Sequence, residues 1–229
     1  MDLSGYRRAT RAFFERPVLE MAPLLLGAVL VHDGGGEAVA VRLTEVEAYA
    51  GAADPGSHSF RGRTDRNATM FGPPGHLYCY FTYGMHHALN VVCDAPGIAT
   101  GCLLRAGEVV QGLGLAHRRR ESPPGKARRE RLRPLADVAL ARGPANLAQV
   151  FDATRATTDG ADLCATRGPW QLWMPDASVD PAAIRTGPRV GVTGEGGDGA
   201  TYPWRFWLAG EPSVSAYRPA AARAPRLGR

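Results

Sequence analysis

The sequence predicts one mixed α/β domain, of the α+β type, around a curved and largely antiparallel β-sheet with flanking helices and a protruding β-hairpin. Stretches rich in β-branched and aromatic residues follow one another with turn signals between them, so most neighbouring strands should be joined as hairpins. Segments with a helical pattern are short. The 229 residues, 45% of them hydrophobic, are enough for one sizeable core. We therefore expect residues 1–229 to form a single domain.

The N-terminal half of the chain is expected to hold one helical region followed by two hairpins. Residues 9–26 have a rough apolar face at helical spacing, with a break at Pro17. Residues 27–49 predict a hairpin whose turn is the sequence DGGG. A long loop with one helical turn follows. Residues 77–92 then predict two strands that meet in a tight turn at Tyr83–Met85.

The C-terminal half alternates short regular elements with charged or glycine-rich segments. We expect a strand over 101–110 that ends near Arg105, a mobile basic loop over 118–133, two short helices over 137–153, strands within 187–197 and 202–215, and a disordered tail over 217–229.

The chain is basic, with a formal net charge of +5 and a pI near 9.3. This balance suits a polyanionic partner, but a genome rich in G and C would enrich arginine in the same way. Lys126 is the only lysine. A mechanism that needs a lysine amine therefore has one candidate, and it lies in the charged loop.

Cysteine usage and hydropathy predict a reduced, cytoplasmic protein. The four cysteines have neither CxxC nor zinc-finger spacing, so we expect mostly buried thiols. The N-terminus lacks the apolar core of a signal peptide. The longest apolar stretch is too short to span a membrane and contains Glu20 and Pro23.

Polar residues with catalytic potential are concentrated in the strand Leu43–Tyr49 and the loop after it. A strand places Glu45, Glu47 and Tyr49 on one face. That face is either solvated or the start of a site. The loop adds further polar groups, His58, Arg61, Arg63 and Arg66.

The segment YCYFTYGM predicts an aromatic wall and an unusual hairpin tip. Tyr78 and Tyr80 share one strand face, which is typical of a core pair or of a wall. Tyr83 lies at the expected turn, where it either folds back on the protein or projects as a wedge between stacked bases. Arg105 lies on an apolar strand, where it is either paired with a carboxylate or exposed at the strand end, and Asn90 on another strand needs polar partners if it is buried. A purely structural role stays open for both.

Several reaction classes lack their sequence signatures. The chain contains no G-x-S-x-G, H-E-x-x-H or Walker A motif, and the zinc deaminase signature is absent as well. Nucleophilic triads and nucleotide-dependent chemistry therefore find little support.

Taken together, several segments resemble the alkyladenine (3-methyladenine) DNA glycosylase family. They occur in the family's order and cover most of the chain outside its ends and the basic loop: LLLGAVLV, TEVEAYAGAADPGSHSFRGRTDRN, MFGPPGHLYCYFTYGMHHALNVV, CLLRAGE, RGPANLAQ, PRVGV and YPWRFWLAGEPSVS. The combination of EAY, HS, GRT-x-RN and YGM is highly specific.

The resemblance implies a monofunctional enzyme of base excision repair. Such an enzyme flips alkylated or deaminated purines, of the 3-methyladenine, 7-methylguanine, hypoxanthine and ethenoadenine class, out of duplex DNA. It hydrolyses the N-glycosidic bond with an activated water and leaves an abasic site. The resemblance further implies a nucleoid-associated monomer that binds damaged double-stranded DNA without a cofactor, a metal or a membrane.

The resemblance also implies roles for individual residues. Glu47 matches the general base, and Arg105 and the Val190 carbonyl match the groups that hold the water with it. The base pocket is matched by Tyr49, His58, Tyr80 and Asn90. The residues inserted into DNA are matched by Tyr83 and Met85. Phosphate contacts are matched by Arg63, Thr64 and Arg66.

Departures from the family pattern are modest. Asp65 replaces a proline in the phosphate loop and places an acid near phosphates, and His86 and His87 occupy variable positions. Two rival classes stay open. A non-catalytic protein that recognises distorted DNA would not need Glu47, and a metal-dependent hydrolase would use Glu45, Glu47 and His58.

Overall fold

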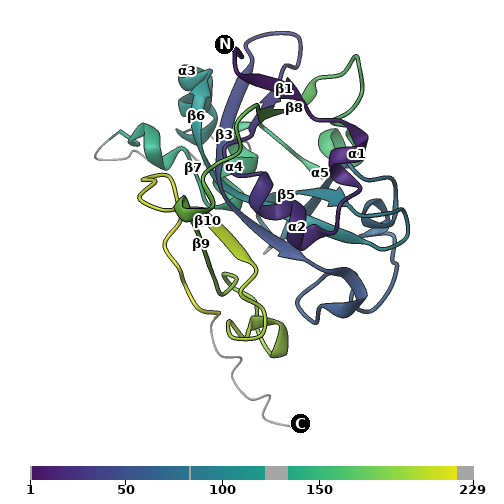
Figure 1. The fold of residues 1–229 in the computed structure, drawn as a ribbon. Helices are drawn as coiled ribbons and strands as arrows, with labels where there is room; N and C mark the ends of the chain where they lie inside the picture. The colour runs from purple at the N-terminus through teal and green to yellow at the C-terminus, as the bar shows by residue number, and fades with distance from the viewer. Residues whose placement is uncertain (1, 83, 122–133, 221–229) are drawn as a thin grey trace.

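The strand β3 (Val39–Tyr49) is the axis of the sheet in the computed structural model, which describes residues 2–82, 84–121 and 134–220 (Figure 1). It pairs with β2 (Val29–His32) and β10 (Arg205–Leu208) along one edge and with β6 (Thr100–Gln111) along the other. A strand of eleven residues is long enough to hold two shorter partners on one edge.

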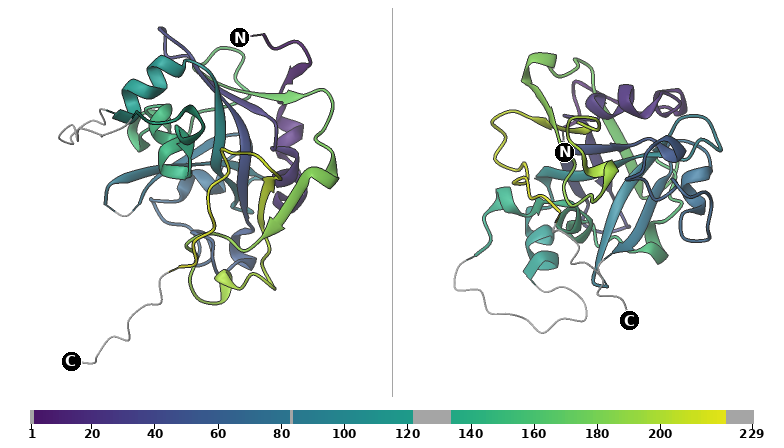
Figure 2. Two further views of the ribbon diagram at one scale, coloured as in Figure 1. Left: turned by 90° about the vertical axis from the view of Figure 1, so that its left-hand side faces the viewer. Right: turned by 90° about the horizontal axis from the view of Figure 1, so that it is seen from below.

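The ten strands of the described residues form one sheet that does not close, and every pair of named strands in it is antiparallel. Its main path runs β1 (Tyr6–Arg8), β8 (Trp170–Pro175), β2, β3, β6, β5 (His86–Cys93) and β4 (Leu77–Thr82), with β7 (Ala141–Arg142) beside β6 and β9 (Ile184–Gly187) beside β10. The hairpin β4–β5 projects from the body of the molecule in both views of Figure 2. The predicted fold class is confirmed.

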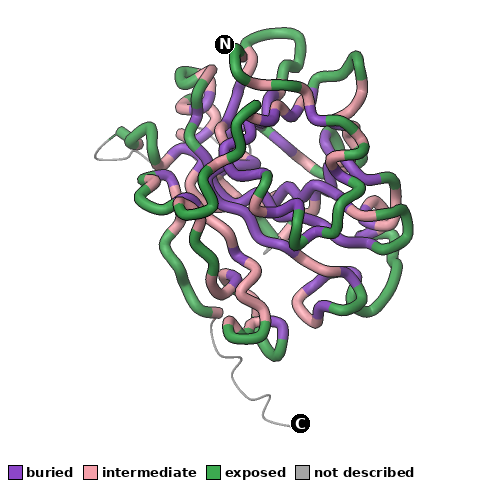
Figure 3. The backbone as a smooth tube through the Cα atoms, in the orientation of Figure 1, coloured by how far each residue is buried: buried purple, intermediate pink, exposed green. Residues whose placement is uncertain are grey.

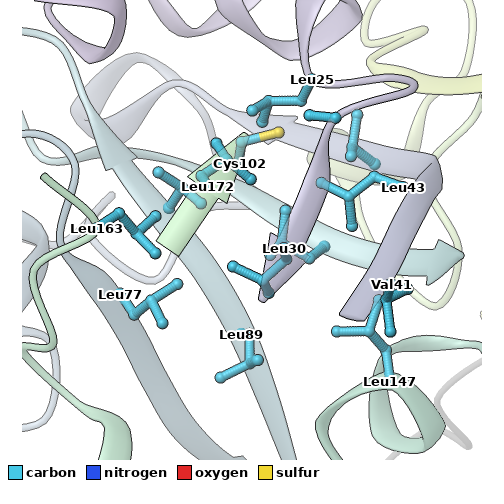
Figure 4. Close-up of a cluster of buried hydrophobic side chains, with 14 of the residues drawn as sticks. Leu25, Leu30, Val41, Leu43, Leu77, Leu89, Cys102, Leu147, Leu163 and Leu172 are labelled. Carbon is cyan, nitrogen blue, oxygen red and sulfur yellow. The ribbon is translucent and has the colours of Figure 1, made fainter. Parts of the chain in front are cut away.

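Five short α-helices accompany the sheet within the described residues. They are α1 (Arg11–Phe14), α2 (Val18–Leu24), α3 (Leu113–Glu121), α4 (Pro144–Val150) and α5 (Arg155–Thr158). Figure 4 shows side chains from α4, from Leu25 just after α2, from several strands and from the loop residue Leu163 meeting in one main core. Burial is concentrated in the strands, while most connecting loops are exposed (Figure 3).

A β-bulge in β3 changes which of its residues face the main core. Leu43 and the alternate residues before it belong to that core. The pairing with β6 shifts register around Glu45, and the next core residues are Val46 and Ala48. Strict alternation would have directed Glu45 and Glu47 into the hydrocarbon core. The bulge therefore allows both glutamates to face the opposite side of the sheet.

Several expected element boundaries need correction. The strand expected to end near Arg105 continues to Gln111 as β6. The expected strand within 187–197 lies earlier, as β9, because Val190 and its neighbours form a turn rather than pairing with β10. Strands β1 and β8 were not predicted, since each is short and their pairing joins distant parts of the chain.

The start of the expected basic loop is helical. Residues 118–121 complete α3, where Arg119 donates to the Val150 carbonyl and Arg120 to the Leu140 carbonyl. These hydrogen bonds to backbone carbonyls hold the arginine side chains in place. Composition alone had predicted that this segment is mobile. The rest of the expected loop, 122–133, and residues 221–229 of the expected tail lie outside the described residues. Residues 217–220 are irregular.

Gly107 tests the importance of the bulge, because it pairs with Leu43 where the register shifts. A Cβ at this position would overlap the Val41 side chain and the Arg42 carbonyl. We expect Gly107→Ala to lower the free energy of unfolding by about 1–3 kcal/mol, measured by urea denaturation. The matched control is Gly36→Ala, where a Cβ meets nothing within 4 Å. Equal stability of the two variants would show that the bulge tolerates a side chain.

Candidate active site

A cavity of about 440 Å³ opens on the face of the sheet opposite the main core. Asn90 and Arg105 line it, and they alternate along their strands with the core residues Leu89 and Leu104. The remaining lining comes from the end of β3 and the loop after it, from the hairpin β4–β5, from Leu103 on β6, from the first two residues of α4 and from the segment 190–193. The pleat of the sheet thus separates the apolar core from a pocket with polar and aromatic walls.

Glu47 lies beneath this pocket with no exposed surface. Its Oε1 accepts a hydrogen bond from the Val190 amide at 2.7 Å and lies 3.2 Å from Arg105 Nη1. Its Oε2 accepts a hydrogen bond from the Tyr49 hydroxyl at 2.9 Å. All three partners line the pocket. Because a carboxylate has about four lone-pair positions, one position is left to accept a hydrogen bond from a further ligand.

Glu45 is also fully buried, so this face of β3 is not simply solvated. Its Oε1 accepts hydrogen bonds from Arg105 Nε at 2.7 Å, from Arg205 Nε at 2.8 Å and from the Ser215 hydroxyl at 2.9 Å. Its Oε2 accepts the Ser215 amide at 2.7 Å. One guanidinium, that of Arg105, therefore contacts both Glu45 and Glu47.

The charges in this cluster stabilise one another. Burial alone would raise the pKa of the Glu45 carboxyl, but the positive charges of Arg105 and Arg205 outweigh it and lower that pKa. Burial likewise opposes the charged form of Arg105, and the two glutamates reverse this effect and raise its pKa. Glu45 therefore remains an anion that holds Arg105 in place. It is not available as a metal ligand beside Glu47.

Aromatic side chains from two strands line the pocket. Tyr49 follows Glu47 on β3, and Tyr80 lies on β4 with its ring stacked 5.4 Å from that of Tyr78. His58, from the loop after β3, contacts Tyr80 edge-to-face at a centroid distance of 4.5 Å, and its Nδ1 lies 3.3 Å from the Tyr78 hydroxyl. The predicted pocket residues are therefore brought together.

His58 is neutral at physiological pH. Although His58 as a whole is exposed, the partial burial of its ring is the main cause that lowers its pKa to about 4, and the positive charge of Arg66 acts in the same direction. A neutral imidazole can accept a hydrogen bond at one nitrogen while it donates at the other. His58 can therefore act either as hydrogen-bond donor or as hydrogen-bond acceptor towards a polar edge of a bound base.

Asn90 lies at the back of the pocket and is 5% exposed. Its Nδ2 donates to the Tyr78 carbonyl at 3.4 Å, across the pairing of β4 with β5. This contact ties the amide to the wall on which Tyr80 also lies. Asn90 is therefore placed to limit the size and polarity of a ligand in the pocket.

The expected phosphate loop lies beside the pocket residue Tyr80, whose ring Arg66 approaches, and Arg63, Thr64 and Arg66 are all exposed. The Thr64 amide donates to Asn67 Oδ1 at 2.7 Å, and Asn67 Nδ2 donates to the His58 carbonyl at 2.9 Å. The buried amide of Asn67 thus joins the exposed arginines to a pocket wall. Arg66 also lies over the Tyr80 ring, at 5.8 Å from its centroid.

Of the two residues expected to enter DNA, Met85 lies near the tip of the projecting hairpin. Met85 is 56% exposed, next to the ends of β4 and β5. Tyr83 lies outside the described residues. Beside them, the exposed ring of Phe81 packs against His87 at a centroid distance of 5.1 Å.

Sequence reasoning missed a second buried charge pair behind Tyr49. Arg189 donates to both carboxylate oxygens of Asp54, at 2.5 and 2.7 Å, and its guanidinium lies 4.6 Å from the centroid of the Tyr49 ring. The available signal was the position of these residues within the quoted segments PRVGV and TEVEAYAGAADPGSHSFRGRTDRN. Arg205 and Ser215 were also missed, because nothing in their local sequence indicates contact with Glu45.

No group of three or more His, Cys, Asp and Glu side chains within the described residues is arranged to hold a metal ion. Over the same residues, no helix is long and apolar enough to cross a bilayer.

Comparison with known proteins identifies the relatives of this chain. The model of the methylpurine-DNA glycosylase family matches residues 12–212. The chain belongs to this family. A protein of Leifsonia xyli named "Putative 3-methyladenine DNA glycosylase" is 54% identical over 201 residues, which are 87% of this chain and 88% of that protein. A protein of the same name from Streptomyces avermitilis is 50% identical over 220 residues, 96% of this chain and 95% of its own length. One from Burkholderia lata is 45% identical over 205 residues, 90% and 89% of the two chains.

Membership of the methylpurine-DNA glycosylase family makes the chain a DNA glycosylase, a hydrolase whose substrate is DNA. The resemblance stated from its motifs is thereby confirmed, and the match covers the whole of the pocket described above. A purely non-catalytic role in recognising distorted DNA does not fit this family.

The pKa of His58 can be measured directly. We expect its ring protons to titrate in NMR spectra with a midpoint near 4, so that the imidazole stays neutral from pH 5 upward. The signal is assigned by its absence from His58→Gln. The unfolded chain takes up this proton nearer pH 6.5, so protonation of His58 favours unfolding as the pH falls from 6.5 towards 4. A midpoint near 6.5 in the folded protein would contradict the described environment.

Proposed function

We propose that the protein excises alkylated and deaminated purines from duplex DNA by hydrolysing the N-glycosidic bond, and that it leaves an abasic site for base excision repair. The observation that carries the proposal is a carboxylate, Glu47, beneath an aromatic pocket large enough for a purine. A base inside a duplex cannot reach such a pocket, so the nucleotide must rotate out of the helix. The partner is double-stranded DNA with a damaged purine, and the protein acts as a monomer without a cofactor.

Glu47 acts as the general base in this proposal. The attacking water hydrogen-bonds to the acceptor position that Val190, Arg105 and Tyr49 leave open on the Glu47 carboxylate, beside the Arg105 guanidinium. The Val190 carbonyl provides its further contact, as the family resemblance implies. The water oxygen bonds to C1′ of the sugar while its proton passes to Glu47. The glycosidic bond breaks, and its electron pair leaves with the base.

The aromatic walls favour the bases that leave most easily. A purine alkylated on a ring nitrogen carries positive charge, and stacking on Tyr49 or Tyr80 favours a cation by about 0.5–2 kcal/mol. The electron pair of the broken bond then neutralises the departing base, so one carboxylate and one water suffice. A neutral lesion such as hypoxanthine needs an added proton as it leaves, and we assign no residue of the pocket as the acid that donates this proton.

The surface around the pocket holds DNA in the flipped state. The exposed side chains of Arg63, Thr64 and Arg66 contact phosphates beside the lesion. Met85, near the tip of the projecting hairpin, and Tyr83, which lies between β4 and β5 in the sequence, fill the gap that the flipped nucleotide leaves. The reaction stops at the abasic site. Lys126 is the only lysine of the chain, which leaves a single candidate lysine for a Schiff base with the sugar, and its sequence neighbourhood is the charged segment rather than the pocket motifs.

The central test of this function is Glu47→Gln, which keeps the shape of the side chain and removes its basicity. Under single-turnover conditions in EDTA, we expect the wild type to release a methylated purine from a duplex, detected by alkaline cleavage. Glu47→Gln should react about 10²–10⁴-fold more slowly while lesion binding changes by less than a few-fold. Near wild-type cleavage by this variant would contradict the role of Glu47.

The matched control for this test is Glu108→Gln. Glu108 is half exposed on β6, where it pairs with Arg42 away from the pocket. Glu45→Gln is not a neutral control, because Glu45 anchors Arg105. Loss of excision in both Glu47→Gln and Glu108→Gln would indicate a general effect of charge rather than catalysis.

Asn90 is proposed to discriminate against undamaged guanine. Guanine carries an exocyclic amino group that hypoxanthine lacks, and a rigid amide at the back of the pocket rejects it by steric overlap and lost hydrogen bonds. We expect Asn90→Ser to raise the ratio of guanine to hypoxanthine excision by about 10-fold or more. The control is Asn146→Ser, on α4, where the amide bonds the Arg142 carbonyl. An unchanged ratio would make Asn90 structural.

A further inference from the structure

Arg189 is a fully buried guanidinium that makes no contact with the pocket interior. It is 1% exposed and does not line the cavity, although Val190, the next residue, does. Its Nη1 donates to the Ala48 carbonyl at 3.0 Å and its Nη2 to the Gly196 carbonyl at 2.7 Å. Burying a charge so completely is costly unless it is paired and fully hydrogen-bonded, and the buried Nε of Arg189 finds no hydrogen-bond partner among the described residues. A position next to a pocket wall therefore calls for a functional explanation.

Asp54 holds the guanidinium in a single orientation. Its two oxygens accept a bidentate pair of hydrogen bonds at 2.5 and 2.7 Å, a geometry that fixes the plane of an arginine. Asp54 is itself fully buried and also accepts the backbone amides of Ala50 and Gly56. The loop that follows β3 and the segment before Val190 are thereby joined at one point.

The guanidinium packs against the rear of the Tyr49 ring. The distance from Arg189 Cζ to the Tyr49 centroid is 4.6 Å, and the rings of Trp204 and Tyr202 lie at 5.2 and 5.6 Å from the same atom. Tyr49 is thus supported on the side away from the pocket. The Tyr49 hydroxyl donates its hydrogen bond to Glu47. Burial, and to a smaller extent the negative charge of Glu47, raise the pKa of the Tyr49 phenol.

We propose that Arg189, held by Asp54, is a positioning residue that fixes Tyr49 both as a wall of the base pocket and as a hydrogen-bond donor to Glu47. Arg189 also precedes Val190, whose amide is the donor to the other oxygen of Glu47. One buried arginine therefore determines the position of two of the three groups that orient the carboxylate. This inference rests on the proposed role of Glu47.

The first experiment compares Arg189→Lys with the wild type. Lysine keeps the charge but loses the planar stack and the bidentate pair. A displacement of about 1 Å in a catalytic group typically costs on the order of 10²-fold in rate, so we expect the single-turnover excision rate to fall about 10- to 100-fold. Binding to a duplex with an abasic site should change by less than about threefold, because the DNA-facing surface is intact.

The control variant is Arg120→Lys, which removes a buried guanidinium that bonds the Leu140 carbonyl and Gln149 Oε1 on the far side of α4. It should lower the melting temperature without reducing the excision rate of the folded protein. If the excision rate of both variants falls in proportion to the loss of melting temperature, the proposal is overturned, because the role of Arg189 would then be purely structural.

A double-mutant cycle shows whether Arg189 acts through Tyr49. In a Tyr49→Leu background, Arg189→Lys should lower the excision rate by a several-fold smaller factor than in the wild-type background, because the side chain that Arg189 positions is already absent. Additive losses would contradict the proposed route. Should Arg189→Lys fail to fold, Gly56→Ala carries the same test. A Cβ there lies 2.6 Å from Arg189 Nη2 and displaces the guanidinium without removing charge, so unchanged excision in that variant would also overturn the proposal.

These outcomes separate the inference from the proposed function. If the wild type releases no modified purine, the proposed function is wrong. If the wild type is active and Glu47→Gln is not, but the Arg189 and Gly56 variants keep full rates, only the inference about Arg189 is wrong.

Discussion

The balance of charge beneath the pocket is the constraint on which the rest of the site depends. Three carboxylates and three guanidiniums lie there, each at most 4% exposed: Glu45, Glu47, Asp54, Arg105, Arg189 and Arg205. Buried charge is destabilising unless each ion finds an opposite partner and hydrogen bonds. Here every acid is paired with an arginine from another strand or loop. Removing any one member leaves an uncompensated charge, so the chemistry and the stability of this region are coupled.

The fold brings these charges together from distant parts of the chain. The bulge in β3 turns its two glutamates away from the core, β6 supplies Arg105, and β10 places Arg205 directly opposite Glu47 in the pairing of the two strands. Ser215, beyond the last strand, completes the coordination of Glu45 through its amide and hydroxyl. The C-terminal segment therefore contributes to the catalytic face, although it lies outside the pocket itself.

Much of the fold and of the first layer of the pocket was predictable from sequence. Alternating strands and turn signals act locally, so they revealed the hairpins and the shared face of Glu45, Glu47 and Tyr49. The pairing of β1 with β8 depends on contacts between distant segments, and local patterns do not report it. The Arg189–Asp54 pair escaped notice for the same reason, since 135 residues separate its members. Arg119 and Arg120 are held in the helix α3 by the carbonyls of Val150 and Leu140. Amino-acid composition does not reveal such partners.

The most direct test of the account is a crystal structure of the protein bound to a duplex that carries a non-hydrolysable analogue of a methylated purine nucleotide. The account predicts the base between Tyr49 and Tyr80, with a water between Glu47 and Arg105 that faces C1′ at hydrogen-bonding distance from the carboxylate, about 2.6–3.2 Å. A complex in which C1′ faces another part of the pocket, or in which a different residue holds the water nearest to C1′, would contradict it.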